Sequence, residues 1–209
     1  MHATAPRIPA PRSNEVYHRP VRLLLASRSP RRQELLTAAG FVFDVAAIDV
    51  NEDQLPDEPP ALYVERVARL KAAAGAARYP SRPVLAADTT VVVDNEMLGK
   101  PQDAAEATRM LRRLAGRTHE VFTGVALAWQ GQVRTRVERT RVWMDSISDA
   151  EIDEYVRTSE PFDKAGSYAI QGWAARYIPH IEGSFANVVG LPVATVVHLL
   201  HDAGVPLRG

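Results

Sequence analysis

The chain has 209 residues, 46% of them hydrophobic, which is enough to bury a core. Its 25 Lys and Arg residues balance 25 Asp and Glu residues, so the net charge gives no reason to expect binding to nucleic acid or to an anionic membrane. There is no cysteine, which excludes disulfides, thiol nucleophiles and cysteine zinc sites. No stretch of the sequence is long and apolar enough to span a membrane, and we therefore expect a cytoplasmic protein.

Residues 1–20 contain four prolines and three arginines without an apolar run. This composition is not that of a secretory signal or a membrane span, and it predicts a disordered N-terminal tail. Residues 21–209 contain no internal repeat and no linker, and we expect them to form a single domain.

The first predicted strand, Leu23–Ala26, runs directly into a helix with two arginines in its first turn. Ser29 is the expected N-cap, and a proline follows it at the first helical position. Arg31 and Arg32 then stand where the helix dipole is already positive and where an acidic residue is usual. Together with the hydroxyl of Ser27, they favour a phosphate site over an arginine pair on a solvated surface.

A short strand is predicted over residues 41–45, followed by an acidic, proline-containing loop over 49–60 that includes Glu52. The next apolar residues recur at helical spacing over 61–79. This spacing predicts an amphipathic helix with Lys71 at the margin of an apolar stripe made of Tyr63, Val67, Leu70 and Ala74.

A carboxylate interrupts the apolar strand predicted over 84–93, where Asp88 is followed by Thr89. A strand of this composition is typically buried on both faces, and an unpaired carboxylate there would be costly. Asp88 therefore needs a metal, a cation or a catalytic role. A structural carboxylate bonded to backbone donors is the alternative.

The middle of the chain predicts a tight turn, a helix and a long hairpin. Lys100 lies between glycine and proline after the 94–96 turn, a position that can aim its ammonium group into a cleft. A helix is predicted over 104–114, and two alternating segments around the Gln130–Gly131 turn predict a β-hairpin. Four arginines on the second strand are interpreted as a solvated face of the sheet, because no aromatic residues interleave with them.

The C-terminal part combines glycine-rich segments with two more helices, predicted over 149–158 and 192–204. Between them, 161–172 and 183–192 contain enough glycine for the backbone to approach a ligand closely. Strands and helices without strict alternation indicate an α/β fold with a mixed, twisted sheet and flanking helices.

The candidate residues combine into the expected composition of a site for a metal-bound polyphosphate. Cationic side chains would hold phosphate oxygens, while Glu52 and Asp88 would hold a divalent metal. The cationic candidates are Arg31, Arg32, Lys71 and Lys100. The amide of Gln171 can donate and accept at once, as recognition of a pyrimidine edge requires.

These segments resemble the Maf nucleotide pyrophosphatases, relatives of the inosine triphosphate pyrophosphatase (Maf/Ham1) fold. The resemblance covers residues 23–200, and its motifs are Ser-x-Ser-Pro-Arg-Arg, Ala-Asp-Thr, Gly-Lys-Pro, Asp-Lys-Ala-Gly, Ile-Gln-Gly and Gly-Ser-x-x-Asn-Val-Val-Gly-Leu-Pro. The form of the segment from Asp163 to Gly172 is similar to the branch that acts on dTTP and UTP. The resemblance implies two lobes around a central cleft, a divalent metal (Mg²⁺ or Mn²⁺) and a cytoplasmic homodimer.

The resemblance also implies individual roles. Asp88 would be the catalytic carboxylate, while Arg31, Thr89 and Gln171 would govern substrate choice. The remaining pocket residues would be Ser27, Ser29, Arg32, Glu52, Lys71, Lys100 and Lys164.

The resulting hypothesis is hydrolysis of dTTP and UTP, or of modified pyrimidine nucleotides, to the monophosphate and pyrophosphate, a housecleaning role. One alternative keeps this chemistry and changes the substrate to 7-methyl-GTP. Another is a nucleotide-binding regulator of cell division that senses phosphate without cleaving it. A nucleic-acid-binding module is the weakest alternative, given the zero net charge.

Overall fold

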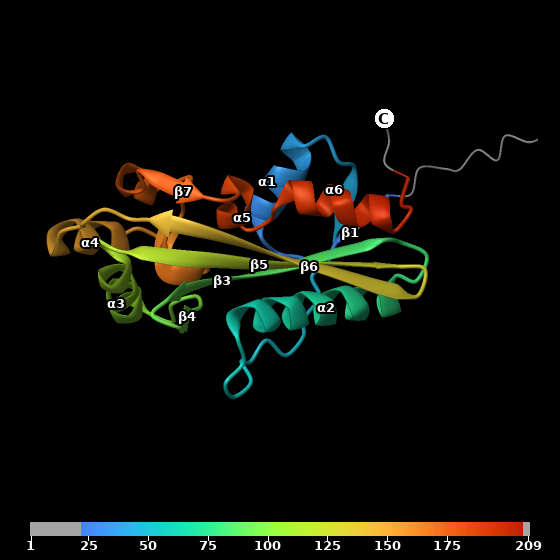
Figure 1. The fold of residues 1–209 in the computed structure, drawn as a ribbon, viewed down its shortest axis with the longest axis horizontal. Helices are drawn as coiled ribbons and strands as arrows, with labels where there is room; N and C mark the ends of the chain where they lie inside the picture. Colours follow the sequence, from blue (N-terminus) through green and yellow to red (C-terminus); the bar gives the residue numbers. More distant parts are fainter. Residues whose placement is uncertain (1–21, 207–209) are drawn as a thin grey trace, which may run out of the picture.

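The computed structural model describes residues 22–206, and the predicted N-terminal tail lies outside them. The described residues form a mixed α/β fold in which helices flank one sheet (Figure 1). The strands are β1 (Leu23–Leu25), β2 (Phe43–Val45), β3 (Val84–Val93), β4 (Glu96–Leu98), β5 (Thr118–Trp129), β6 (Gln132–Trp143) and β7 (His180–Glu182). The α-helices are α1 (Pro30–Ala38), α2 (Pro60–Arg78), α3 (Ala104–Leu114), α4 (Asp149–Val156), α5 (Phe185–Val189) and α6 (Val193–Asp202). Three short 3₁₀ helices, η1 (Glu160–Asp163), η2 (Ala165–Ser167) and η3 (Trp173–Tyr177), form most of the segment before β7.

The sheet confirms the predicted mixed topology. Its strand order is β2-β1-β3-β5-β6-β7, with β4 paired to β3. β1 runs parallel to β2 and β3, and the other pairs are antiparallel. The predicted hairpin is β5–β6, and both residues of its turn have positive φ, Gln130 at 50° and Gly131 at 77°. Its exposed strand carries the four arginines, of which Arg136, Arg139 and Arg141 pair with Asp202, Glu120 and Glu182.

Helices cover both faces of the sheet at the β1 end, α2 on one side and α1 with α6 on the other (Figure 1). Strand residues alternate between two cores accordingly. Leu85 and Ala87 pack with the α6 side, whereas Val84 and Ala86 pack with α2. A third apolar cluster, containing Val91, lies toward α3 and α4. This double coverage explains why β3 reads as an almost continuous apolar run.

Packing between α2 and β5 corrects the predicted apolar stripe of the helix. The buried residues are Val64, Val67, Ala68, Lys71, Ala72 and Gly75, whereas Leu70 is 41% exposed and Ala74 is also exposed. Small side chains face the sheet because the two backbones come very close there. Lys71 is therefore inside the buried stripe rather than at its margin.

Gly124 of β5 lies at the closest approach of these two backbones. A Cβ at this position would overlap the carbonyl of Val64 and come within 2.8 Å of the Glu65 nitrogen. We expect Gly124→Ala to lower the free energy of unfolding by about 2–3 kcal/mol, because backbone atoms cannot rotate away as a side chain could. Urea denaturation measures the change, and Gly131→Ala, where a Cβ would meet nothing within 4 Å but φ is positive, is expected to cost about 1 kcal/mol.

Two further boundaries differ from the predictions. β2 begins at Phe43 rather than at residue 41, because the Phe41 N–H bonds the Leu36 carbonyl and so caps the end of α1. α6 spans Val193–Asp202 rather than residues 192–204. Within residues 22–206, none of the helices has the length and apolar character needed to cross a bilayer.

Candidate active site

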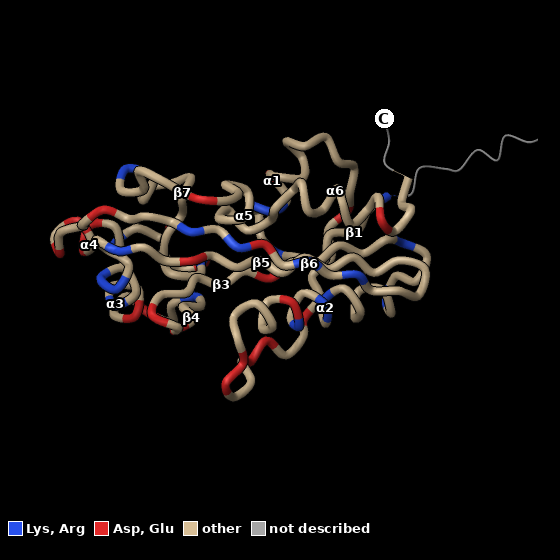
Figure 2. The backbone as a smooth tube through the Cα atoms, in the orientation of Figure 1, with Lys and Arg blue, Asp and Glu red and all other residues tan. Residues whose placement is uncertain are grey.

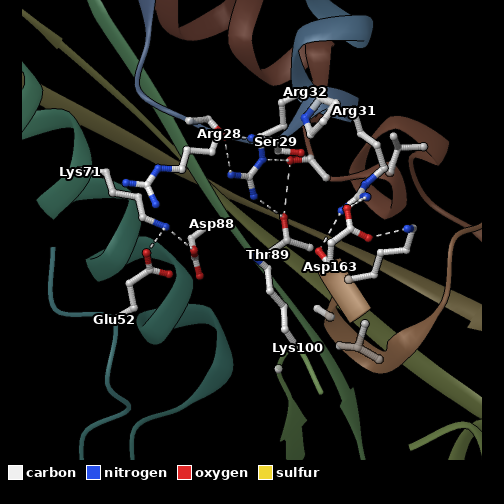
Figure 3. A pocket seen from close by; sticks show the side chains of 18 of the residues that line it. Arg28, Ser29, Arg31, Arg32, Glu52, Lys71, Asp88, Thr89, Lys100 and Asp163 are labelled. Atoms are coloured by element: carbon white, nitrogen blue, oxygen red, sulfur yellow. Dashed lines mark hydrogen bonds and ion pairs between the residues drawn. The ribbon is translucent and has the colours of Figure 1, made fainter. Parts of the chain in front are cut away.

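A cavity of about 620 Å³ lies at a gap in the sheet, along β3. β1 pairs with β3 only as far as Leu85, and β4 begins to pair with it at Val91. The edge of β3 between these pairs, including Asp88 and Thr89, faces the cavity. Figure 3 shows side chains from α1, α2, β3 and the η1 region converging on this space.

The cavity brings together most of the predicted site residues, although they come from distant parts of the sequence. Those that line it are Ser27, Ser29, Arg31, Arg32, Glu52, Lys71, Asp88, Thr89, Lys100 and Lys164. Gln171 is exposed and is not among the lining residues, so its role in reading the base stays a prediction.

Lys71 joins the two candidate carboxylates. Its Nζ lies 2.8 Å from Asp88 Oδ1 and 3.0 Å from Glu52 Oε1 (Figure 3). Asp88 and Lys71 are both nearly buried, since only 10% and 11% of their side chains are exposed, whereas half of the Glu52 side chain is exposed. The arrangement places two hard oxygen ligands and one ammonium group at one point of the cavity wall.

The environment of Asp88 adjusts its basicity. Burial raises the pKa of Asp88 above its ordinary value, although the positive charges of Lys71 and Arg32 oppose the shift. A carboxylate with a raised pKa is a better proton acceptor than one exposed to water. Asp88 is therefore suited to the catalytic role predicted for it.

Arg32 is bound by protein oxygens from three parts of the chain. Its guanidinium donates to the carbonyls of Gly190 (2.8 Å) and Ala87 (2.7 Å), and to the hydroxyls of Ser27 (3.3 Å) and Thr89 (3.1 Å). The Ala87 carbonyl belongs to the edge of β3 just past the end of its pairing with β1, so Arg32 supplies the donor that a neighbouring strand would provide. Burial lowers the pKa of Arg32, against the attraction of Asp88.

Arg31 points to the other side of the cavity, where it meets Asp163. Arg31 Nη1 lies 2.9 Å from Asp163 Oδ2, and Lys164 Nζ lies 2.5 Å from Asp163 Oδ1. Burial alone would raise the pKa of Asp163, but the hydrogen bonds from Lys164 and Arg31 outweigh it, and the pKa is lowered. Asp163 thus keeps two cations oriented at the cavity surface.

The start of α1 differs in detail from the prediction. Ser29 occupies the N-cap position and Pro30 is the first helical residue, yet the Ser29 side chain makes no capping hydrogen bond. The Oγ of Ser27 instead accepts from the Ser29 N–H at 3.2 Å. Ser29 nevertheless lines the cavity, as predicted.

Glu52 and Asp88 fit a small divalent cation. Their carboxylate oxygens converge on the same ammonium group, and both are hard ligands. Within the described part of the chain, no group of three or more His, Asp or Glu side chains is arranged to hold a metal. One or two carboxylates completed by phosphate oxygens and water are the usual protein contribution to a Mg²⁺ site.

Several lining residues were not predicted as site residues. Arg28 pairs with Asp49 at 2.8 Å near the rim, and the hydroxyl of Tyr63 donates to the Glu52 carbonyl at 3.0 Å. Asp163 has a sequence signal, because it stands next to Lys164 in the Asp-Lys-Ala-Gly motif. Tyr63 has no such sequence signal, because aromatic residues on an amphipathic helix usually belong to the core.

Tyr168 lines the cavity and bonds a buried histidine. His119 Nε2 lies 2.7 Å from the Tyr168 hydroxyl, and the ring centroids are 5.4 Å apart in an edge-to-face arrangement. His119 Nδ1 is buried and has no hydrogen-bond partner among residues 22–206. Burial lowers the pKa of His119 from 6.5 to about 4.

The His119 shift predicts acid sensitivity. Between pH 6.5 and 4 the unfolded chain binds a proton at His119 that the folded chain does not, so the free energy of unfolding falls as pH falls. The full contribution of His119 to the free energy of unfolding, lost as pH falls through this range, is about 3 kcal/mol. Urea denaturation across this range should show the slope in the parent protein and a reduced slope in His119→Gln. His198→Gln, at an exposed position, should leave it unchanged, and an equal slope in all three proteins would contradict the assignment.

Comparison with known proteins gives a consistent result over nearly the whole described chain. The family profile described as "Maf-like protein" matches residues 22–203. The chain is 51% identical over 185 residues to a protein of Myxococcus xanthus, 50% identical over 183 residues to one of Koribacter versatilis, and 52% identical over 190 residues to one of Anaeromyxobacter dehalogenans. Each alignment covers 88–89% of this chain and 94–96% of the relative, and each relative is named dTTP/UTP pyrophosphatase. The chain therefore belongs to the Maf-like family.

Proposed function

We propose that this protein is a nucleoside triphosphate pyrophosphatase that hydrolyses dTTP and UTP to the monophosphate and pyrophosphate. The observation that carries the proposal is the Glu52–Lys71–Asp88 contact, set in a cavity that also collects Arg31, Lys100 and Lys164. The choice of substrate is supported by the names of the relatives, whose sequences are about 50% identical to this chain over most of both chains.

Positioning and charge neutralisation would provide most of the catalysis. The cations of the cavity would neutralise the triphosphate chain. Asp88 would accept the proton of the attacking water, whose oxygen bonds to phosphorus as the bridging P–O bond between the α and β phosphates breaks and pyrophosphate leaves. Thr89 lies beside Asp88, and its hydroxyl is held by Arg32 and by Thr123 (2.9 Å). This fixed hydroxyl supports its proposed role in substrate choice.

Glu52 and Asp88 would hold Mg²⁺ or Mn²⁺. When bound, the metal would supply charge stabilisation at the phosphate oxygens. The remaining ligands would come from substrate and water, since two carboxylates from the chain leave most of an octahedral shell free.

The proposal extends to a cytoplasmic homodimer and to two lobes around the cleft, as in the inosine triphosphate pyrophosphatase fold. The separate apolar clusters at the two ends of β3, with the cavity along the strand between them, support the two-lobed description. Size-exclusion chromatography with light scattering tests the oligomeric state.

Incubation with dTTP, UTP, CTP and 7-methyl-GTP plus Mn²⁺, with products identified by mass, tests the function. We expect pyrophosphate together with TMP or UMP, and slower turnover of the other two nucleotides. Preferential cleavage of 7-methyl-GTP would show that dTTP and UTP are not the main substrates. Binding of nucleotide without turnover would show that the protein is a nucleotide sensor and not an enzyme.

A further inference from the structure

The loop between β2 and α2 carries Glu52 beyond its apolar anchor, since Ile48 packs against the core under α2 but the segment 51–57 has no buried apolar side chain. Residues 49–59 form no helix or strand, and every side chain from 51 to 57 is exposed. Leu55, the large apolar side chain among them, is 51% exposed. The loop also carries five carboxylates, Asp49, Glu52, Asp53, Asp57 and Glu58, which repel one another (Figure 2). The position of residues 51–57 therefore depends on polar contacts with the rest of the molecule.

The first two turns of α2 supply those contacts. The hydroxyl of Tyr63 donates to the carbonyl of Glu52 at 3.0 Å, and Arg66 Nη2 donates to the next carbonyl, that of Asp53, at 2.9 Å. Two consecutive peptide groups are thus held from the same helix. The backbone of Glu52 is fixed at the point from which its side chain reaches Lys71.

Arg66 also clamps the far end of the loop. Its guanidinium makes two hydrogen bonds to Glu58, at 2.6 and 2.7 Å, and only 8% of the Glu58 side chain is exposed. Glu58 Oε2 in turn accepts the N–H of Leu55 at 3.1 Å. A planar, two-pronged pair of this kind fixes orientation as well as distance. By contrast, the Arg28–Asp49 pair at the start of the loop is mostly exposed and contributes little.

We propose that Arg66, together with Glu58, is a positioning residue that holds Glu52 in place for the metal-bound triphosphate. Arg66 is not among the residues that line the cavity, so it acts through the loop rather than on the substrate. Because α2 also carries Lys71 and packs closely on the sheet, one rigid element sets both the ammonium group and the carboxylate opposite it. This role rests on the proposed function, since it assigns Arg66 to the geometry of that same site.

Arg66→Gln tests the role against Arg69→Gln, a control one turn further along α2 whose guanidinium bonds Glu65 and Thr135. We expect Arg66→Gln to raise the Mn²⁺ concentration for half-maximal dTTP hydrolysis about 10-fold, as loss of a group that orients a metal ligand commonly does. Amide exchange over residues 49–58 should accelerate in this variant without substrate or metal present. Arg69→Gln should change neither quantity, and Glu58→Gln should reproduce both effects of Arg66→Gln.

A double variant separates positioning from general destabilisation. If Arg66 acts through Glu52, adding Arg66→Gln to Glu52→Gln should lower the activity no further. The inference would be overturned if the activity losses of the two single variants multiplied in the double variant, or if amide exchange were unchanged in Arg66→Gln. Absence of turnover by the parent protein would instead count against the proposed function, and the exchange measurement would still report whether Arg66 holds the loop.

Discussion

Asp88→Asn should reduce the rate of pyrophosphate release about 10²- to 10⁴-fold, the range associated with loss of a positioned general base. The substitution keeps the shape of the side chain, and Lys71 retains Glu52 as a partner. The free energy of unfolding should therefore change by no more than about 1 kcal/mol. Steady-state release of pyrophosphate and urea denaturation measure the two quantities.

The pH dependence of the parent protein sharpens this test. Because the pKa of Asp88 is raised above 3.8, the acid limb of kcat/KM should lie above that value and should be absent from the residual activity of Asp88→Asn. Asp44→Asn is the control. This carboxylate lies on β2, pairs with Arg22 and Arg82, and does not line the cavity. Full activity in Asp88→Asn would remove Asp88 from the mechanism.

Arg32→Met should lower the free energy of unfolding by about 3–5 kcal/mol, a large fraction of the stability of a typical domain. Removing the guanidinium leaves the carbonyls of Ala87 and Gly190 without a donor in a mostly buried place. Arg32→Lys should recover little, because one ammonium group cannot reproduce the planar fork that reaches both carbonyls.

Arg28→Met provides the comparison for Arg32. The Arg28 side chain is 70% exposed and pairs with an exposed Asp49, so we expect the free energy of unfolding to fall by less than about 1 kcal/mol. Equal urea midpoints for the Arg28 and Arg32 variants would show that the hydrogen bonds of Arg32 to the backbone are not a major source of stability.

The local patterns predicted most of the elements, because each had its own periodicity. β3, the β5–β6 hairpin and the start of α1 at Pro30 follow from apolar runs, a Gln-Gly turn and the serine-proline pair. Leu70 was wrongly predicted to lie in the buried stripe of α2. Helical spacing alone does not reveal that the sheet backbone comes too close to this helix for a large side chain to fit between them. Lys71 could be identified as a candidate, but its burial between two carboxylates depends on that close packing.

The partners of the site residues were harder to predict than the residues themselves. Arg31 and Arg32 stood out because their position at a helix N-terminus is unusual, and we expected an anion opposite them. The structure places the Asp163 carboxylate opposite Arg31, and opposite Arg32 two backbone carbonyls and two hydroxyls. Backbone carbonyls have no signature in a sequence, so this part of the arrangement could come only from the fold.

The hydrogen bond between Arg32 and Gly190 spans 158 residues, and the pair of Arg31 and Asp163 spans 132. Both connect the first helix to the last third of the chain. During synthesis, the two arginines of α1 therefore lack these acceptors until residues 163 and 190 have been added. A chain released early, before Asp163, would contain β3 with Asp88 but would lack Asp163, Lys164 and Gly190 from the wall of the cavity.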